Sequence, residues 1–170
     1  MAGPVKGAGR VTRLALLTAI ALTIFMVEAQ LPALTAIPGV KLGLANIVTV
    51  YAVFVLGPGD ALLVLSGRVF LGAVFSGQMM TLLYSAAGGL LSWCALCGLK
   101  KLLTREQIWL ASPVAAVCHN LGQLLAAAAV MRTWAVMAYL PYLVIAAVAA
   151  GLFTGIAAQA LLKRLNKIQK

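Results

Sequence analysis

The chain has 170 residues, of which 64% are hydrophobic and 9% are charged, and its net charge is +10. So few charged residues cannot cover the surface of a soluble domain of this size, so the composition predicts an integral membrane protein. The basic excess does not support nucleic-acid binding, because aromatic residues are not interleaved with the cations as base stacking would require.

Six apolar segments follow one another along the chain. Most approach the ~20 residues needed to cross the hydrocarbon core of a bilayer, while the second and third are shorter. These two are either tilted spans or a re-entrant pair, and neither choice changes the topology of the rest. The sequence predicts one all-α membrane domain over 14–162, preceded by a basic segment, 1–13, and followed by a basic tail, 163–170. The predicted helices cover about 14–31, 42–56, 60–77, 79–99, 112–131 and 136–162.

The cations gather in three clusters: before the first apolar segment, between the fourth and fifth, and after the sixth. Basic clusters in short segments beside apolar spans follow the positive-inside rule. All three clusters fall on one side if six helices cross the membrane, so we predict a six-transmembrane-helix bundle with both termini cytoplasmic. The clusters are Lys6, Arg10 and Arg13; Lys100, Lys101 and Arg105; and Lys163, Arg164, Lys167 and Lys170.

The stretch between the first two segments, EAQLPALTAIPGVKLGLAN, combines charged residues with helix breakers. Backbone freed from regular helix at membrane depth needs partners from water, side chains or a ligand. We therefore predict an extracytoplasmic loop that covers a small-molecule pocket, with Glu28, Lys41 and Asn46 as substrate-binding candidates. For Lys41, a snorkelling cation at the outer interface is an equal alternative.

Further polar residues lie within the later apolar segments. Arg68 stands in the middle of the third predicted helix, and Gln78 stands at its end. His119, Asn120 and Gln123 lie within one arc of about 100° on the fifth helix, at 100° per residue. Ionisable residues inside a membrane are functional candidates, and three polar groups on one narrow helix face exceed what packing needs. We predict that all five residues contact the substrate. The structural alternatives are an Arg68–Glu28 pair that locks two helices and hydrogen bonds between helices worth ~0.6 kcal/mol each.

Cysteine spacing raises the question of a metal or redox site. Cys94 and Cys97 form a C-x-x-C, and Cys118 adjoins His119. A C-x-x-C inside an apolar helix is usually two small buried side chains, and no second pair has ligand spacing. We expect neither a metal nor a cofactor.

The chain also lacks the groups that common catalytic mechanisms need. Its three acids, Glu28, Asp60 and Glu106, are far apart in the sequence, whereas magnesium-diphosphate chemistry needs clustered carboxylates. No G-x-x-x-x-G-K-[ST] loop is present, so the chain cannot hydrolyse ATP by itself. We expect a protein that is not an enzyme.

Small residues at helical spacing predict close helix contacts. Ala15 and Ala19 form such a pair on the first helix, and Gly88–Gly89 and Gly151 with Gly155 follow later. These pairs allow close approach within the bundle or to a partner subunit.

Four motifs carry a resemblance to a known family. They are P-G-V-K-L-G-L-A-N over 38–46, S-G-R-x-x-x-G over 66–72, S-A-A-G-G-L-L-S over 85–92 and H-N-L-G-Q-L over 119–124. Together they resemble the Gx transporter family, whose members are often labelled heptaprenyl diphosphate synthase component I. The resemblance covers about 28–155. That family is grouped with the S components of energy-coupling factor (ECF) transporters.

The resemblance implies an S-component-like fold with six helices, both termini inside and an outward-facing vitamin pocket. It implies a multi-pass protein of a prokaryotic cell membrane that captures a small vitamin- or precursor-sized molecule for uptake. The implied partners are an ECF-type coupling subunit and its ATPases, with Ala15 and Ala19 touching the coupling subunit. The alternative is a non-catalytic membrane partner in isoprenoid-quinone synthesis or flavin-based extracellular electron transfer. A third interpretation is a structural bundle without a ligand.

Overall fold

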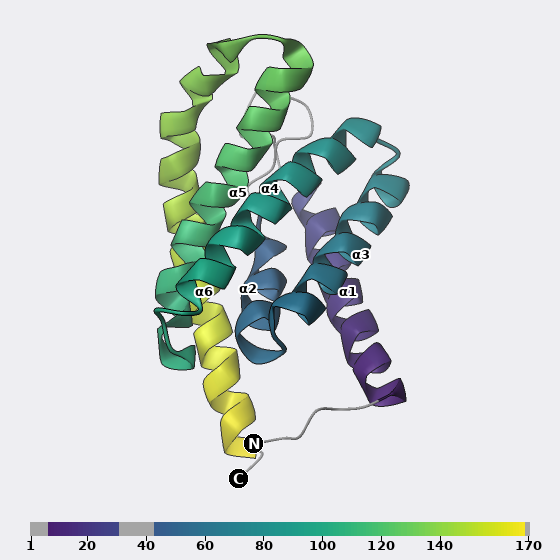
Figure 1. Cartoon of the computed structure of the whole chain (residues 1–170), viewed down its shortest axis with the longest axis vertical. Helices are drawn as coiled ribbons and strands as arrows, with labels where there is room; N and C mark the ends of the chain where they lie inside the picture. The colour runs from purple at the N-terminus through teal and green to yellow at the C-terminus, as the bar shows by residue number, and fades with distance from the viewer. Residues whose placement is uncertain (1–6, 31–42, 169–170) are drawn as a thin grey trace.

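The computed structural model describes residues 7–30 and 43–168, with side chains as far as residue 164. Within these residues every regular element is a helix, which confirms the all-α prediction for the part of the chain described. Figure 1 shows the helices packed side by side as one bundle. The elements are α1 (Ala8–Glu28), α2 (Asn46–Val55), α3 (Pro58–Ser76), α4 (Met79–Leu99), η1 (Arg105–Gln107), α5 (Ile108–Met131), η2 (Trp134–Tyr139) and α6 (Leu140–Ile168).

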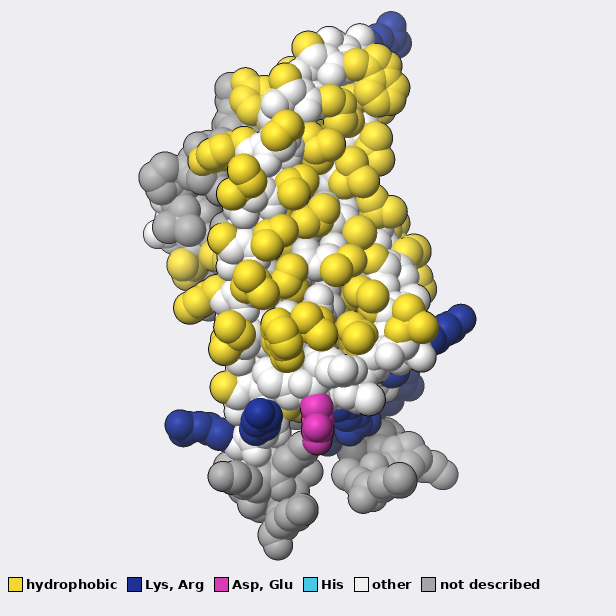
Figure 2. Space-filling model, turned by 90° about the vertical axis from the view of Figure 1, so that its left-hand side faces the viewer, with side chains coloured by type: hydrophobic (Ala, Val, Ile, Leu, Met, Phe, Trp, Pro, Cys, Tyr) yellow, Lys and Arg dark blue, Asp and Glu magenta, His cyan; other side chains and the backbone are white. Residues whose placement is uncertain are grey.

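Five of the helices, α1, α3, α4, α5 and α6, are long and apolar enough to cross a membrane. The helix α2 has 10 residues and is shorter than a bilayer requires. Large hydrophobic side chains such as Phe70, Ile145 and Phe153 are exposed on the long helices, as a lipid-facing surface requires. Figure 2 shows this hydrophobic flank between ends that carry Lys and Arg side chains. The molecule is a membrane helical bundle.

Several helices extend beyond the ranges predicted from hydropathy. The helix α1 begins at Ala8 rather than near residue 14, and α6 continues to Ile168 rather than ending near residue 162. Hydropathy reports where the apolar span ends, whereas a helix can continue into water until a breaker stops it. The helix α5 begins at Ile108 and includes Pro113, which membrane helices tolerate when neighbouring groups compensate.

Glycine and proline residues determine how several of the helices begin and end. Gly57 has φ 113° and Pro58 opens α3, where its missing N–H costs no hydrogen bond. Gly77 ends α3 in the left-handed conformation, which glycine adopts without strain. A 3₁₀ turn, η2, occupies the predicted start of the sixth helix, and α6 itself begins at Leu140 with Pro141 in its first turn.

Interactions between helices tie one end of the bundle together. At the start of α1, Arg10 donates to Asp60 in the first turn of α3. Where α4 ends, Lys100 Nζ donates to the Val53 carbonyl of α2 at 2.7 Å. The two described chain ends, in α1 and α6, lie at this same end of the molecule in Figure 1. The cations of the α4–α5 connection therefore lie with those of the first and last helices.

Close contacts between α4, α5 and α6 confirm the prediction made from small residues. A Cβ added to Gly88 would lie 2.6 Å from the His119 carbonyl oxygen of α5. At Gly151, an added Cβ would lie 2.5 Å from the Pro113 Cα, and at Gly155 it would lie 2.8 Å from the Trp109 carbonyl oxygen. Glycine is therefore required at all three positions, and the backbones of these helices touch.

Candidate functional site

Polar side chains from several helices are buried together inside the bundle. None of them is more than 6% exposed, although they come from segments far apart in the sequence. Buried polar groups are normally hydrogen-bonded, so each bond and each missing bond is informative. The polar cluster comprises Glu28 of α1, Asn46 of α2, Arg68 of α3, Ser92 of α4, and His119 and Gln123 of α5; Asn120 of α5 is also buried and faces α6.

The side chains of His119 and Gln123 meet on one face of α5. The His119 Nε2 and Gln123 Nε2 atoms are 3.1 Å apart, as residues one turn apart on a helix allow. The His119 Nδ1 atom has no hydrogen-bond partner in the part of the chain the structure describes. This nitrogen faces the backbone of Gly88 on α4, which interacts with the imidazole.

Gly43 lies between Glu28 at the end of α1 and the imidazole of His119. Its backbone N–H donates to Glu28 Oε1 at 2.5 Å, and its carbonyl accepts from the Asn46 N–H at 2.9 Å. Its φ is 84°, and an added Cβ would lie 2.7 Å from His119 Cδ2. Both the backbone angle and the contact therefore require glycine, which places bare backbone against the histidine ring.

Arg68 supplies a positive charge in the same region. Its side chain is 2% exposed and interacts electrostatically with Glu28 and with His119. Among the described residues, its Nε and Nη2 atoms have no hydrogen-bond acceptor. An enclosed guanidinium with unused N–H groups favours an incoming acceptor, and a carboxylate or phosphate fits its planar geometry best.

Asn46 adds an acceptor to these donors. Its Nδ2 donates to Ser92 Oγ at 2.7 Å, which joins the start of α2 to α4. Its Oδ1 is buried without a donor from the described residues. The cluster therefore offers both donors and an acceptor to a polar molecule.

Asn120 points in another direction, toward α6. Its Nδ2 donates to the Leu143 carbonyl at 3.2 Å, and its Oδ1 has no partner within the described chain. Consecutive residues on a helix differ by about 100°, so Asn120 and His119 reach different neighbours. The structure thus brings His119 and Gln123 together and places Asn120 at the α5–α6 contact.

A glycine crossing between α4 and α5 supports the cluster. A Cβ added to Gly122 would lie 2.7 Å from the Ala87 carbonyl oxygen and 2.8 Å from the Gly88 Cα. An added Cβ on Gly88 would also lie 2.9 Å from Gln123 Cγ and 3.0 Å from His119 Nδ1. These glycines let α4 approach closely enough to enclose both polar side chains.

One protein-family model matches most of the chain. The family model described as heptaprenyl diphosphate synthase component I matches residues 17–161, which includes every cluster residue. The chain belongs to the heptaprenyl diphosphate synthase component I family. No curated protein and no solved structure matches the chain.

Besides Asn120, two of the predicted substrate-binding residues are not among the residues of the polar cluster. Gln78 lies away from the cluster, and Lys41 lies outside the described residues. Gln78 is exposed at the start of α4, where its Oε1 accepts from Thr81 Oγ1 at 3.2 Å. It precedes Gly88 by ten residues, which is about 15 Å along a helix. Lys41 and the predicted loop over 32–41 lie outside the described residues.

The predicted partner-contact residues lie on the surface of α1. Ala15 and Ala19 are both exposed, and α1 is the least buried of the five long helices. Small exposed residues on a lightly packed helix are compatible with a partner subunit, so the partner assignment stays a prediction.

Sequence reasoning did not assign a site role to Gly43 or Ser92. Both lie inside motifs that carried the family resemblance, P-G-V-K-L-G-L-A-N and S-A-A-G-G-L-L-S. The glycine among helix breakers was a usable signal, because a glycine in a polar loop often marks close approach of backbone to another group. The partner of Ser92 is 46 residues away, and no local pattern reveals it.

The three cysteines, Cys94, Cys97 and Cys118, are free thiols. Within the described residues, no three side chains of the His, Cys, Asp and Glu types stand close enough to share a metal ion.

Proposed function

We propose that this chain is a membrane substrate-binding subunit, similar to the S component of an ECF transporter. It captures a small vitamin- or precursor-sized molecule and passes it on with the help of a partner ATPase module. The observation that carries this proposal is the set of buried polar atoms on Arg68 and Asn46 that have no hydrogen-bond partner among the described residues.

These atoms are costly without a ligand. A buried donor or acceptor left unsatisfied costs about 1–3 kcal/mol, and a charged group costs more. A molecule with an anionic or acceptor-rich group facing Arg68 and a donor facing Asn46 would satisfy them. The cluster therefore favours a small ligand with a polar end that carries both kinds of group.

The proposed orientation follows from the charges. Described cations cluster at the end of the bundle that holds the described chain ends, and the positive-inside rule makes that end cytoplasmic. In this orientation all six helices cross or enter the membrane and both termini are cytoplasmic. Glu28 and the start of α2 then lie toward the outside, so the ligand enters from the extracytoplasmic side.

We further propose that the subunit is not catalytic. Glu28 is buried in the polar cluster, Asp60 pairs with Arg10 at the opposite end, and Glu106 lies in η1. A metal-diphosphate reaction needs carboxylates that share one ion, and these three belong to separate regions. Energy would come from ATPases that contact α1 through a coupling subunit, with Ala15 and Ala19 on the exposed face.

Mass spectrometry of compounds released from gently purified protein would identify the ligand. Affinity for that compound should fall at least tenfold, about 1.4 kcal/mol, in the double variant His119→Ala with Gln123→Ala. The matched control is Ser112→Ala with Thr154→Ala, which removes another buried polar pair on α5 and α6. The control should lose stability and keep its affinity. Unchanged affinity in the first double variant would remove the site assignment.

The family description, which names a synthase component, favours a second function, a non-catalytic membrane partner in isoprenoid-quinone synthesis. A partner in flavin-based extracellular electron transfer is the other form of this alternative. The polar cluster would then meet a prenyl diphosphate or a protein. Affinity purification from native membranes separates the two functions. Recovery of coupling ATPases supports transport, whereas recovery of a prenyl synthase or a flavoprotein supports assembly.

A further inference from the structure

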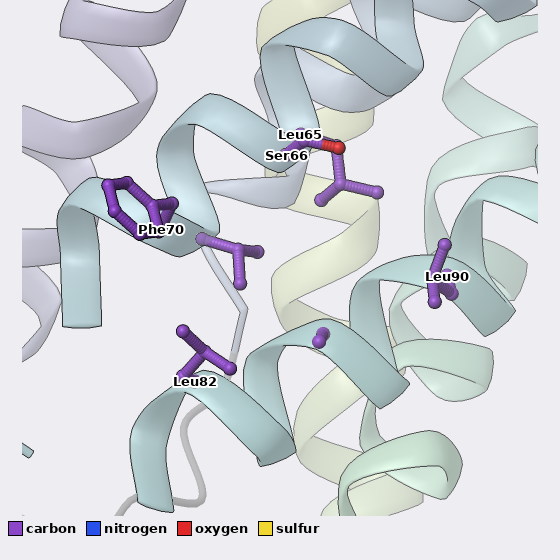
Figure 3. A pocket seen from close by; sticks show the side chains of 7 residues that line it. Leu65, Ser66, Phe70, Leu82 and Leu90 are labelled. Atoms are coloured by element: carbon purple, nitrogen blue, oxygen red, sulfur yellow. The ribbon is translucent and has the colours of Figure 1, made fainter. Parts of the chain in front are cut away.

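An apolar groove runs along the outer side of α3 and α4. It encloses a cavity volume of about 210 Å³, and the Ser66 hydroxyl is the one polar side-chain group in its lining. Figure 3 shows side chains of both helices facing each other across this space. The lining residues are Leu65, Ser66, Val69, Phe70, Leu82, Ala86 and Leu90.

The groove lies at membrane depth and faces outward. Both of its helices are long and apolar enough to span a bilayer, and Phe70 and Leu90 are exposed on them. Hydrocarbon chains would fill such a space, because water has almost no polar group there to bind. The groove alone does not distinguish bulk lipid from a specific ligand.

One contact between α3 and α4 stands between this groove and the polar cluster. Leu65 lines the groove, and its Cδ1 lies 2.7 Å from where a Cβ on Gly89 would stand. The neighbouring Gly88 faces the other way, against His119 and Gln123. The groove and the cluster are therefore on opposite sides of the same turn of α4.

The same relation holds on α3. Arg68 follows Leu65 by one turn and is buried, while Ser66 and Val69 line the groove. The Nε and Nη2 atoms of Arg68, which have no partner among the described residues, thus lie on the same stretch of α3 as the apolar groove. The contact between the two helices here is the Leu65 side chain against Gly89.

We propose that the ligand is an anionic amphiphile that enters from the outer, extracytoplasmic leaflet of the membrane, between α3 and α4. Its charged head binds Arg68 in the polar cluster, and its single apolar chain lies in the groove. This inference rests on the proposed binding function and names its substrate class. A water-soluble ligand would use the cluster and leave the groove to bulk lipid.

Dodecyl phosphate and ethyl phosphate test the proposal, because they share a head and differ in the chain. Binding is measured with purified protein in nanodiscs of zwitterionic lipid, with protein-free nanodiscs as the blank. Wild-type protein should bind dodecyl phosphate more tightly than ethyl phosphate. Ala86→Phe, which fills the groove, should weaken dodecyl phosphate about tenfold and leave ethyl phosphate unchanged. Ala149→Phe on α6 is the matched control, since Ala149 is exposed and does not line the groove.

The variant Arg68→Gln distinguishes the amphiphile proposal from the broader proposal that the polar cluster binds a ligand. It should weaken both probes, because both share the phosphate head. If Ala86→Phe has no effect while Arg68→Gln weakens both probes equally, the amphiphile proposal is overturned and the binding function survives. If wild-type protein binds both probes with equal affinity, or binds neither, the amphiphile proposal is also overturned. If the probes bind and Arg68→Gln changes neither, the polar site of the proposed function is lost as well.

A labelling experiment on wild-type protein avoids any effect of a variant on folding. A dodecyl phosphate analogue with a diazirine on its chain should label peptides of α3 and α4 on illumination, and excess dodecyl phosphate should prevent the labelling. Equal labelling of α6 would show general contact with lipid-dissolved probe and would overturn the assignment of the groove.

Discussion

Replacing Gly122 by alanine should push helices α4 and α5 apart. An added Cβ would lie 2.7 Å from the Ala87 carbonyl oxygen, 2.8 Å from the Gly88 Cα and 2.9 Å from the Ala87 carbonyl carbon. All three are backbone atoms, so no side-chain rotation can relieve the contact. Relief requires a shift of one whole helix relative to the other, and this shift would loosen the enclosure around His119.

The expected cost combines two opposing terms. Overpacking a close contact costs about 1–3 kcal/mol. Alanine is preferred to glycine inside a helix by about 0.8–1.0 kcal/mol, which offsets part of that cost. Gly122→Ala should therefore lower the free energy of unfolding by up to about 2 kcal/mol. The matched control is Gly98→Ala in the last turn of α4, where an added Cβ meets nothing within 4 Å. The control should be neutral or slightly stabilising.

The free energy of unfolding of both variants can be measured by titration with sodium dodecyl sulfate in mixed micelles. Because both changes replace a helical glycine by alanine, their difference removes most of the propensity term and leaves the steric cost of about 1–3 kcal/mol. Equal stability of the two variants would show that α4 and α5 do not touch through backbone at this point. Ligand affinity should fall in Gly122→Ala and stay unchanged in Gly98→Ala.

Three further changes probe separate contacts. Gly43→Ala should weaken ligand binding more than stability, because the new Cβ would displace the His119 ring; wild-type affinity would show that the ring does not contact the ligand. Ser92→Ala should cost about 1–3 kcal/mol in the same unfolding titration by leaving the Asn46 Nδ2 donor unpaired, and no loss would mean that another acceptor replaces the hydroxyl. The side chain of Gln159 caps the start of α5, because its Oε1 accepts from the Ile108 N–H and its Nε2 donates to the Arg105 carbonyl. Gln159→Leu should therefore speed amide hydrogen exchange at the start of α5. An unchanged exchange rate would exclude this capping role.

Much of the fold was predictable because its signals are local. Apolar segments of about 20 residues have few stable alternatives to a spanning helix, since lipid offers no partner to exposed backbone. The bounds predicted for the fourth helix, 79–99, match α4. The family resemblance was likewise confirmed, because its motifs are short and contiguous.

The candidate site was predictable only in its parts. Helical periodicity placed His119, Asn120 and Gln123 on one arc, and the first and last of them do bond to each other. The same periodicity could not say that Asn120 would meet the Leu143 carbonyl of α6 instead. That outcome depends on where α6 crosses α5.

By itself, the sequence determined that this protein is a helical membrane bundle with buried polar residues and basic ends. Only the tertiary structure decided which polar groups share one enclosure, that Gly43 lies against His119, and that Leu65 packs against Gly89 beside an apolar groove. The physical reason is the distance along the sequence over which each kind of interaction acts. Hydropathy and helical period act between residues a few positions apart, whereas hydrogen-bond partners 15 to 46 residues apart are chosen by how whole helices pack.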